Sequence, residues 1–390
     1  MNFIPYGRQN ITEEDIDAVV NVLKSDYLTQ GPKVPEFEDT IKKHCNIEYA
    51  LAMNSATSAL HVACLALDVG KGDIVWTTPI TFVASANCAL YCGATVDFVD
   101  IDPKTYNLST QSLEHKLKAA KEQGKLPKVV IPVHLCGQPC DMERIYQLSK
   151  KYGFSIIEDA SHAIGGKYKN QPIGNCQYSD ITIFSFHPVK IITTAEGGVA
   201  TTKSKELAQK MELLRSHGIT RDSDLMTHEP DGSWYYQQIT LGFNYRMTEM
   251  QAALGVSQIK RLNTITDRRH QLAKTYDSLL ADLPVITPYQ HSDGYSGLHL
   301  YVIRLKINQI QKSHKEVFDE LRAANIGVNL HYIPVHLQPY YQQNLGFKAG
   351  DFPEAELYYS QAISLPMYPD LTKEQQTYIA NILGSILKHD

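Results

Sequence analysis

The sequence has no long uninterrupted run of hydrophobic residues, and its first ten residues, MNFIPYGRQN, contain no basic segment followed by an apolar one. A helix that crosses a membrane needs about 20 mostly apolar residues, and an export signal needs a basic segment before an apolar one. We therefore expect neither a membrane span nor an export signal, and a cytoplasmic location.

An excess of positive charge is also lacking, because 37 Lys and Arg stand against 42 Asp and Glu, for a formal net charge of -5. Proteins that bind nucleic acid through its phosphates carry a basic patch or stripe. No nucleic-acid partner is expected, and a small anionic substrate would have to be bound by local cations.

The seven cysteines are few and odd in number for a chain of 390 residues, which favours reduced thiols over a disulfide framework. Cys88 and Cys92, and likewise Cys136 and Cys140, are separated by three residues. No histidine recurs beside them at the spacing of a zinc site, and the pairs fit an apolar helix and a strand-to-helix loop. We expect no metal site.

A glycine-rich dinucleotide-binding turn is missing too. The run Gly70-Lys-Gly72 has no third glycine at the required spacing and precedes its predicted strand instead of following it. The sequence therefore does not favour a nicotinamide oxidoreductase.

What the sequence does contain is an alternation of strand and helix signals from about residue 50 to residue 205, without internal repeats or low-complexity tracts. This alternation is typical of βαβ units and a parallel sheet. Amphipathic helices are predicted at 141–152 and 205–215. The predicted strands are 74–78, 95–99, 129–133, 154–157, 181–184 and 199–202.

A long helix is predicted to carry the chain into a second domain. It begins at a capping box, Thr248-Glu-Met-Gln251, and runs through Gln258 and Tyr276. A chain of this length exceeds one typical core, so we expect domains at 1–250 and 251–390. The second domain reads as α+β, with a strand at 300–305, a helix at 315–324, a turn at 325–327 leading to a strand that ends at 331, a mobile loop at 292–297 and a last helix from residue 372.

Lys190 is the most informative residue, in the run SFHPVKIITTAEGG (185–198). It follows an apolar strand and is surrounded by small and hydroxyl residues. A desolvated lysine amine has a lowered pKa and can add to an aldehyde as a Schiff base. A lysine taken alone is usually a solvated surface residue, so its neighbours decide the interpretation.

Asp159 belongs to the run FSIIEDASHA (154–163), whose apolar start predicts a buried parallel strand. Ligands of open α/β sheets bind at the carboxyl ends of the strands, where an aspartate can pair with a cationic heteroaromatic nitrogen. An acid in this place alone is more often a helix cap. Asp159, His162, a second strand at 180–185 and then Lys190 together are typical of a fold type I enzyme that uses pyridoxal phosphate (PLP).

A phosphate site is predicted at Asn54-Ser-Ala-Thr57, which follows a short apolar strand and opens a helix. Free backbone N–H groups and hydroxyls gather at the positive end of such a helix. An ordinary N-cap is the alternative. Ser185, five residues before Lys190, could add a hydroxyl to the same anion.

Seven stretches in a fixed order resemble the sugar-nucleotide aminotransferases of the DegT/DnrJ/EryC1/StrS family. They are NSATSALH (54–61), TTPITFVASAN (77–87), EDASHAIGG (158–166), SFHPVKIITTAEGG (185–198), RSHG (215–218), LGFNYRMTEMQAALG (241–255) and HYIPVH (331–336). The resemblance implies the α/β fold of PLP-dependent transferases of fold type I, with a large domain built on a mostly parallel sheet and a small C-terminal α+β domain.

The same resemblance implies the catalytic pair Lys190 and Asp159. Lys190 holds the cofactor and moves the proton, and Asp159 faces the pyridine nitrogen. In the family, the position of Phe82 stacks on the cofactor, that of His162 contacts its phenolic oxygen, and that of Asn244 reaches the phosphate of the neighbouring subunit. On the residues alone, a core phenylalanine and a structural histidine remain alternatives. The cofactor set is Ser55, Ala56, Thr57, Phe82, Asp159, His162, Ser185, Lys190 and Asn244, in a homodimer with shared active sites.

The expected substrates are L-glutamate and a UDP-sugar. The stretches GRQNITEEDI and SDYLTQGPKVPEFE resemble family members that aminate C4 of a UDP-linked 4-keto-6-deoxy-2-acetamido sugar in the pseudaminic acid pathway. Enzymes for UDP-4-amino-4-deoxy-L-arabinose or for dTDP-4-amino sugars are the alternative. The substrate set is Tyr6, Asp26, Tyr27, Leu28, Thr29, Ala56, Ser185, Asn244, His331, Tyr332, Ile333 and Pro334, with Arg215, Arg221 and Arg246 as candidate cations.

Two alternative functions to transamination are compatible with the same fold and cofactor. Related sugar dehydratases carry histidine in place of the lysine, so Lys190 favours transamination, and a non-catalytic PLP-fold sensor would be expected to lose Asp159 or Lys190. One position departs from the family pattern, because Ala195 stands where many members have glycine. If that position requires a positive φ, alanine costs about 1 kcal/mol or more.

Overall fold

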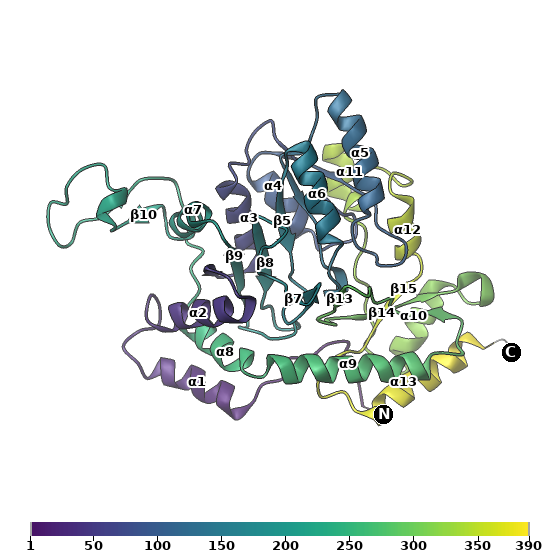
Figure 1. The fold of residues 1–390 in the computed structure, drawn as a ribbon. Coiled ribbons are helices and arrows are strands. Elements are labelled where there is room, and N and C mark those ends of the chain that lie inside the picture. Colours follow the sequence, from purple (N-terminus) through teal and green to yellow (C-terminus); the bar gives the residue numbers. More distant parts are fainter. Residues whose placement is uncertain (1, 389–390) are drawn as a thin grey trace.

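The computed structural model describes residues 2–388 and is built on one large sheet in the order β1-β9-β8-β5-β4-β2-β3 (Figure 1). The five strands from β3 to β8 pair in parallel, and β9 runs antiparallel to both β8 and β1. The bounds are β1 Tyr49–Met53, β2 Ile74–Thr77, β3 Thr95–Phe98, β4 Val129–Ile131, β5 Ser155–Asp159, β8 Ile181–Ser185 and β9 Gly198–Thr202. The predicted, mostly parallel sheet is confirmed, and each predicted strand lies within two residues of its observed bounds.

Helices cover both faces of this sheet because successive strand residues point to opposite sides. Val75 packs in one cluster with α3 (Ala56–Ala66), α4 (Ala84–Tyr91) and α7 (Lys205–Arg215), whereas its neighbour Trp76 packs in another with α5 (Thr110–Glu122) and α6 (Met142–Tyr152). α2 (Lys33–Cys45) and α8 (Glu249–Ile259) pack on Phe184 of β8 and Val199 of β9. Because helices cover both faces, most residues of these strands are buried, including all of β4, β8 and β9.

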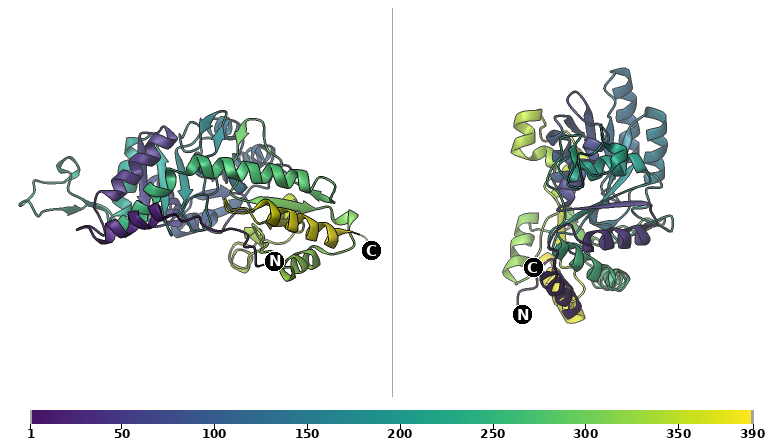
Figure 2. Two further views of the ribbon diagram at one scale, coloured as in Figure 1. Left: turned by 90° about the horizontal axis from the view of Figure 1, so that it is seen from below. Right: turned by 90° about the vertical axis from the view of Figure 1, so that its left-hand side faces the viewer.

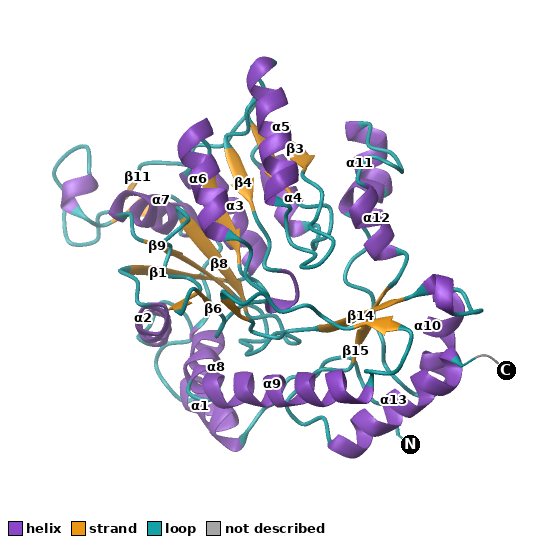
Figure 3. Ribbon diagram, turned by 45° about the vertical axis from the view of Figure 1, so that its right-hand side comes forward, coloured by secondary structure: helices purple, strands orange, loops and turns teal. Residues whose placement is uncertain are grey.

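A second core surrounds a three-stranded antiparallel sheet, β12 (Val285–Ile286), β14 (Tyr301–Leu305) and β15 (Ala362–Leu365). Figure 3 shows this sheet beside α9 (Leu262–Leu279), α10 (His314–Ala323) and α13 (Lys373–Leu387), and α9 and α13 run side by side in Figure 2. The separate core supports our proposal of two domains divided near residue 250. α11 (Pro339–Leu345) and α12 (Pro353–Tyr359) pack instead against β3, where Phe98 contacts Tyr341 and Phe352.

The prediction of one continuous helix through Gln258 and Tyr276 was wrong, because this stretch forms two separate helices, α8 and α9. The capping box at Thr248 and Gln251 is confirmed. The break lies at Lys260 and Arg261, where the Arg261 guanidinium donates to Asp15 Oδ2 at 2.6 Å. This contact links the start of α9 to α1 (Glu13–Leu23).

Two predictions in the second domain also differ from the structure. Residues 325–331 form only isolated bridges, Ile4 with Ile326 and Asn329 with Ser364, instead of a strand, because the N-terminal segment pairs with them there. The loop at 292–297 contains β13 (Gly294–Tyr295), which pairs with β6 (Lys167–Tyr168). The backbone of this predicted mobile loop is therefore hydrogen-bonded.

The seven cysteines are all free thiols, with Cys88 in α4, Cys92 at its end, and Cys136 and Cys140 in the loop between β4 and α6. Among residues 2–388, no helix combines the length and apolar character needed to cross a bilayer.

An arm, residues 221–236, projects from the strands β10 (Ile219–Thr220) and β11 (Gln237–Gln238), away from the large sheet (Figure 1).

Candidate active site

A cavity of about 560 Å³ lies at the carboxyl ends of β5 and β8. Its walls come from the start of α3, the loop between β2 and α4, the loop after β8, and the segment at 329–332. Eleven of the predicted site residues line it, namely Tyr6, Ser55, Ala56, Thr57, Phe82, Asp159, His162, Ser185, Lys190, His331 and Tyr332. Asp26, Tyr27, Leu28, Thr29, Asn244, Ile333 and Pro334 are not among its lining residues.

Lys190 lies in the loop between β8 and β9, which folds back on Phe186. The Phe186 carbonyl accepts hydrogen bonds from Thr193 Oγ1 at 3.0 Å and from the Thr194 N–H at 2.9 Å. Burial lowers the pKa of the Lys190 amine to about 8, although the charge of Asp159 opposes the shift. The neutral, nucleophilic amine is therefore far more abundant near pH 7 than in an ordinary lysine.

Two backbone positions fix this loop. Ala195 has a φ of 65°, so the position does require the left-handed conformation, in which alanine costs about 1–2 kcal/mol. The Thr193 hydroxyl accepts the Ala195 N–H at 2.9 Å and offsets part of that cost. Gly198 begins β9 so close to α3 that a Cβ would lie 2.5 Å from the Ser55 carbonyl and the Ala56 nitrogen. Only glycine fits there.

Asp159 ends β5 and is 4% exposed. Its Oδ1 accepts the Ser161 N–H at 3.0 Å, and its Oδ2 accepts the Ser85 hydroxyl at 2.6 Å. β5 pairs with β8, so that Asp159 lies opposite Ile183, two residues before Ser185. A carboxylate with both oxygens bonded is held in one orientation against the cavity.

The start of α3 forms an anion cradle. Ser55 caps the helix, and its Oγ accepts the Ser58 N–H at 3.0 Å. The N–H groups of Ala56 and Thr57, in the first turn, have no partner within the helix, and both residues face the cavity. These donors at the positive end of a helix suit a phosphate.

His162 and Tyr332 form a neutral hydrogen-bonded pair in the cavity wall. His162 Nδ1 accepts the Cys136 N–H at 3.2 Å, which assigns the ring proton to Nε2, and this nitrogen lies 3.1 Å from the Tyr332 hydroxyl. Burial, together with the charge of Lys190, holds the pKa of His162 well below its usual range. Phe82, 58% exposed, offers an uncovered ring face at the cavity.

Another wall of the cavity contains Tyr6, from the N-terminal segment, and His331, from the second domain. Their ring centroids are 5.4 Å apart, and His331 Nδ1 lies 2.8 Å from Ser364 Oγ. Burial and the nearby Lys190 charge lower the pKa of His331 to about 3. The imidazole is therefore neutral at ordinary pH and can exchange hydrogen bonds with hydroxyl groups.

The three candidate arginines do not line the cavity. Arg215 forms an ion pair with Glu38, and Arg246 donates to a serine hydroxyl at 3.1 Å. Arg221 lies on the arm. Among the described lining residues, Lys190 is the one lysine or arginine.

Seven polar residues of the cavity lining were not predicted as site residues, namely Thr81, Ser85, Ser161, His187, Glu196, His299 and Asn329. Ser85 lies within the stretch TTPITFVASAN, four residues after Thr81 at a helix start, and this spacing could have indicated a paired contact. His299 comes from the second domain, and no local pattern marks it. Its ring lies 4.5 Å from that of His162.

The residues present fit PLP. An amine suited to an aldehyde, an anion cradle, a fixed carboxylate and an exposed aromatic ring all face one cavity. These groups match the aldehyde, the phosphate, the pyridine nitrogen and the ring face of that cofactor. The neutral His162 and Tyr332 are suited to a phenolic oxygen.

Comparison with known proteins gives the same assignment over the whole chain. The sequence model of the DegT/DnrJ/EryC1/StrS aminotransferase family matches residues 9–384. The UDP-4-amino-4,6-dideoxy-N-acetyl-beta-L-altrosamine transaminase of Campylobacter jejuni is 37% identical over 386 residues, which cover 99% of this chain and 98% of that protein. The structure of Helicobacter pylori PseC, an aminotransferase involved in the biosynthesis of pseudoaminic acid, superposes with a TM-score of 0.90 at 32% identity and covers 99% of both chains. The PLP-form of the putative sugar aminotransferase Spr1654 from Streptococcus pneumoniae has a TM-score of 0.88 at 32% identity and covers 98% of both chains. The protein therefore belongs to the DegT/DnrJ/EryC1/StrS aminotransferase family and is a PLP-dependent sugar aminotransferase.

Proposed function

We propose that the protein transfers the amino group of L-glutamate to C4 of a UDP-linked 4-keto-6-deoxy-2-acetamido sugar, as in the pseudaminic acid pathway. The observation that carries this proposal is the 37% identity, over 99% of the chain, to a transaminase named for such a sugar. A second candidate has support as well, because a UDP-4-amino-4-deoxy-L-arabinose–oxoglutarate aminotransferase of Shewanella sediminis is 35% identical over 379 residues.

The residues of the cavity have separable tasks in this reaction. PLP, when bound, supplies an electron sink and carries the amino group between the two substrates. Lys190 would hold its aldehyde carbon, Asp159 its pyridine nitrogen, and the start of α3 with Ser185 its phosphate. Phe82 would cover one face of its ring.

Lys190 has a second task once its amine is free. A pKa of about 8 allows the amine to accept the proton from Cα of the amino donor and to return it at the cofactor side, because an efficient base has a pKa near the working pH. His162 and Tyr332 would hold the phenolic oxygen. Tyr6, Asn329 and His331 present polar groups at the same cavity and would bind sugar hydroxyls.

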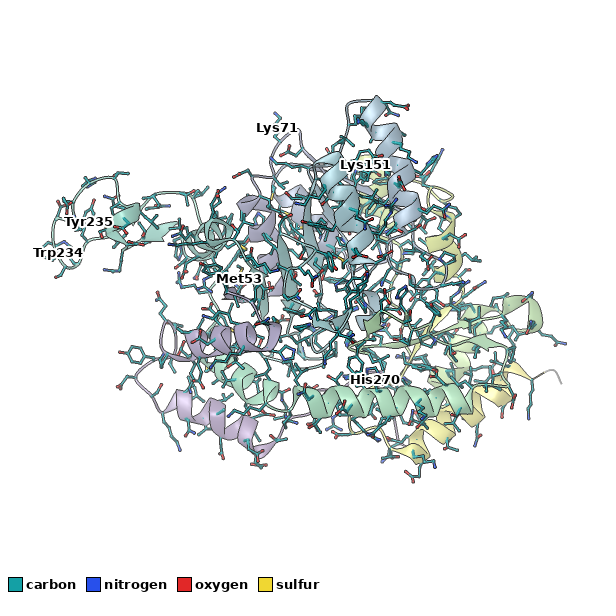
Figure 4. The ribbon with its side chains drawn as sticks, viewed as in Figure 1. Met53, Lys71, Lys151, Trp234, Tyr235 and His270 are labelled. Carbon is teal, nitrogen blue, oxygen red and sulfur yellow. The ribbon has the colours of Figure 1, made fainter. Side chains whose placement is uncertain are left out.

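A homodimer would complete the site. A nucleotide sugar and the cofactor phosphate are anionic, yet Lys190 is the one lysine or arginine among the described lining residues. Asn244 is exposed, and so is the segment from Asp26 to Thr29. The arm also leaves Trp234 72% exposed at its far end (Figure 4). We propose that these surfaces contact a second copy, in which Asn244 and residues 26–29 reach the partner's cavity.

The substrate is tested by incubating the purified protein with glutamate and a panel of 4-keto UDP-sugars and dTDP-sugars, followed by mass spectrometry of the products. The acetamido hexose is expected to be aminated with a kcat/KM at least about tenfold above that of the 4-keto pentose. Preference for the pentose would favour the second candidate. Failure with every sugar, despite a cofactor that accepts the amino group of glutamate, would contradict both.

The shared site is tested by mixing two inactive variants, Lys190→Ala and Asn244→Ala. After random exchange, half of the dimers are hybrids in which one of two sites keeps both residues, so about a quarter of wild-type activity should return. Lys190→Ala mixed with Asp159→Asn is the matched control, since these residues serve the same cavity and no site becomes intact. Equal recovery in both mixtures, or none in the first, would argue against a contribution of Asn244 to the partner.

A further inference from the structure

Two buried hydroxyl groups, those of Thr81 and Ser85, form a series of hydrogen bonds with Asp159. Thr81 Oγ1 is 2.8 Å from Ser85 Oγ, and Ser85 Oγ is 2.6 Å from Asp159 Oδ2. Thr81 is 2% exposed and Ser85 1% exposed. The three side chains form one chain of hydrogen bonds that ends on the carboxylate.

The direction of the protons in this chain is determined by its last member. An ionised carboxylate only accepts hydrogen bonds, so Ser85 must donate its single proton to Asp159. The Ser85 oxygen is then free to accept, and Thr81 donates to it. Each bond in such a chain polarises the next, which strengthens the short contact on Oδ2.

The two oxygens of Asp159 are held differently. Oδ1 accepts a backbone N–H, that of Ser161, at 3.0 Å. Within residues 2–388, Ser85 is the side chain that donates to the carboxylate. Substitution at residue 85 can therefore change the orientation of the Asp159 carboxylate without altering the strand that carries it.

The segment that supplies these hydroxyls also borders the cavity. Thr81 follows β2, Phe82 exposes its ring at the cavity, and Ser85 is the second residue of α4. The N-terminal end of α4 therefore lies near the carboxylate. One short segment, residues 81–85, thus contributes an aromatic ring to the cavity and a hydrogen bond to Asp159.

We propose that Ser85, supported by Thr81, is a positioning residue that keeps the Asp159 carboxylate aimed at the pyridine nitrogen of the bound cofactor. This inference rests on the role of Asp159 in the proposed function. Without the Ser85 hydroxyl, the carboxylate loses one of the two hydrogen bonds that restrain it.

The direct test is nitrogen NMR of the holoenzyme reconstituted with 15N-labelled pyridoxal phosphate. The chemical shift of the pyridine nitrogen reports whether it is protonated. In Ser85→Ala the nitrogen is expected to lose its proton at a pH lower than in the wild type by about one unit, because a carboxylate that is no longer held in place pairs less closely with the protonated nitrogen. Ser85→Thr keeps a hydroxyl and should restore the wild-type titration.

Kinetics provide a second readout. The rate at which glutamate converts the bound cofactor should fall about tenfold or more in Ser85→Ala, with less than about a twofold change in the KM for glutamate. Thr81→Val should change both readouts in the same direction by a smaller amount. Ser149→Ala is the matched control, because Ser149 is another buried serine, on α6, which donates to the Tyr146 carbonyl at 2.8 Å.

An unchanged nitrogen titration in a folded Ser85→Ala protein would overturn the inference. If Ser85→Ala does not fold, Thr81→Val decides, and its wild-type titration would overturn the inference equally. Failure of this inference can be distinguished from failure of the proposed sugar substrate. The nitrogen titration and the reaction with glutamate do not depend on which sugar is the acceptor.

Discussion

Lys190→Ala is expected to leave a folded protein that binds pyridoxal phosphate without a covalent bond and has no measurable transamination. The absorbance band of the lysine-bound cofactor should be absent, borohydride should fix no cofactor to the chain, and kcat should fall at least about a thousandfold because both the linkage and the proton transfer are lost. Lys169→Ala is the control, since Lys169 is a partly exposed surface residue paired with Glu143. A covalent cofactor in Lys190→Ala would contradict the assignment.

The pH dependence of cofactor capture tests the environment of this amine. With a pKa of about 8, about a tenth of the Lys190 amines are neutral at pH 7, whereas an unperturbed lysine would have fewer than about one in a thousand. The rate at which apoenzyme captures the aldehyde should therefore rise about tenfold per pH unit below pH 8 and level off above it. A rate that still rises at pH 10 would show that the amine is solvated.

Asp159→Asn is expected to slow the reaction with glutamate by a factor of about a hundred to a thousand, while cofactor binding persists. The amide has nearly the same shape but no charge, so it cannot keep the pyridine nitrogen protonated. Stopped-flow absorbance of the bound cofactor after mixing with glutamate measures the effect.

Asp180→Asn is the matched control, because Asp180 also accepts a backbone N–H, that of Ile156, at 2.7 Å, but lies at the opposite end of the sheet. It should change stability more than rate. If the rate of Asp159→Asn is within about a factor of ten of the wild-type rate, the Asp159 carboxylate does not have the proposed role in the reaction.

Local patterns predicted the large sheet and the centre of the site because both depend on short stretches. Alternating apolar strands and helices are legible within windows of ten to fifteen residues. Lys190 and Ser55 follow strands and Asp159 ends one, and the carboxyl ends of neighbouring strands meet at one edge of the sheet. The structure brings all three to one cavity.

The features that escaped prediction depend on contacts between distant parts of the chain. The break between α8 and α9 forms where Arg261 reaches Asp15, 246 positions away. Ser85 contacts Asp159 across 74 positions, and only the strand order, with β4 between β2 and β5, brings them together.

Gly198 determines how the two halves of the site are spaced. The first residue of β9 lies between Ser185 and Met53 in the sheet and directly against the Ser55 carbonyl, with no room for a methyl group. The loop that carries Lys190 and the helix start that forms the anion cradle are thus joined through main-chain atoms alone. The strand that follows the Lys190 loop is consequently held at a fixed distance from the cradle, and a larger residue at position 198 would move the main chain of one relative to the other.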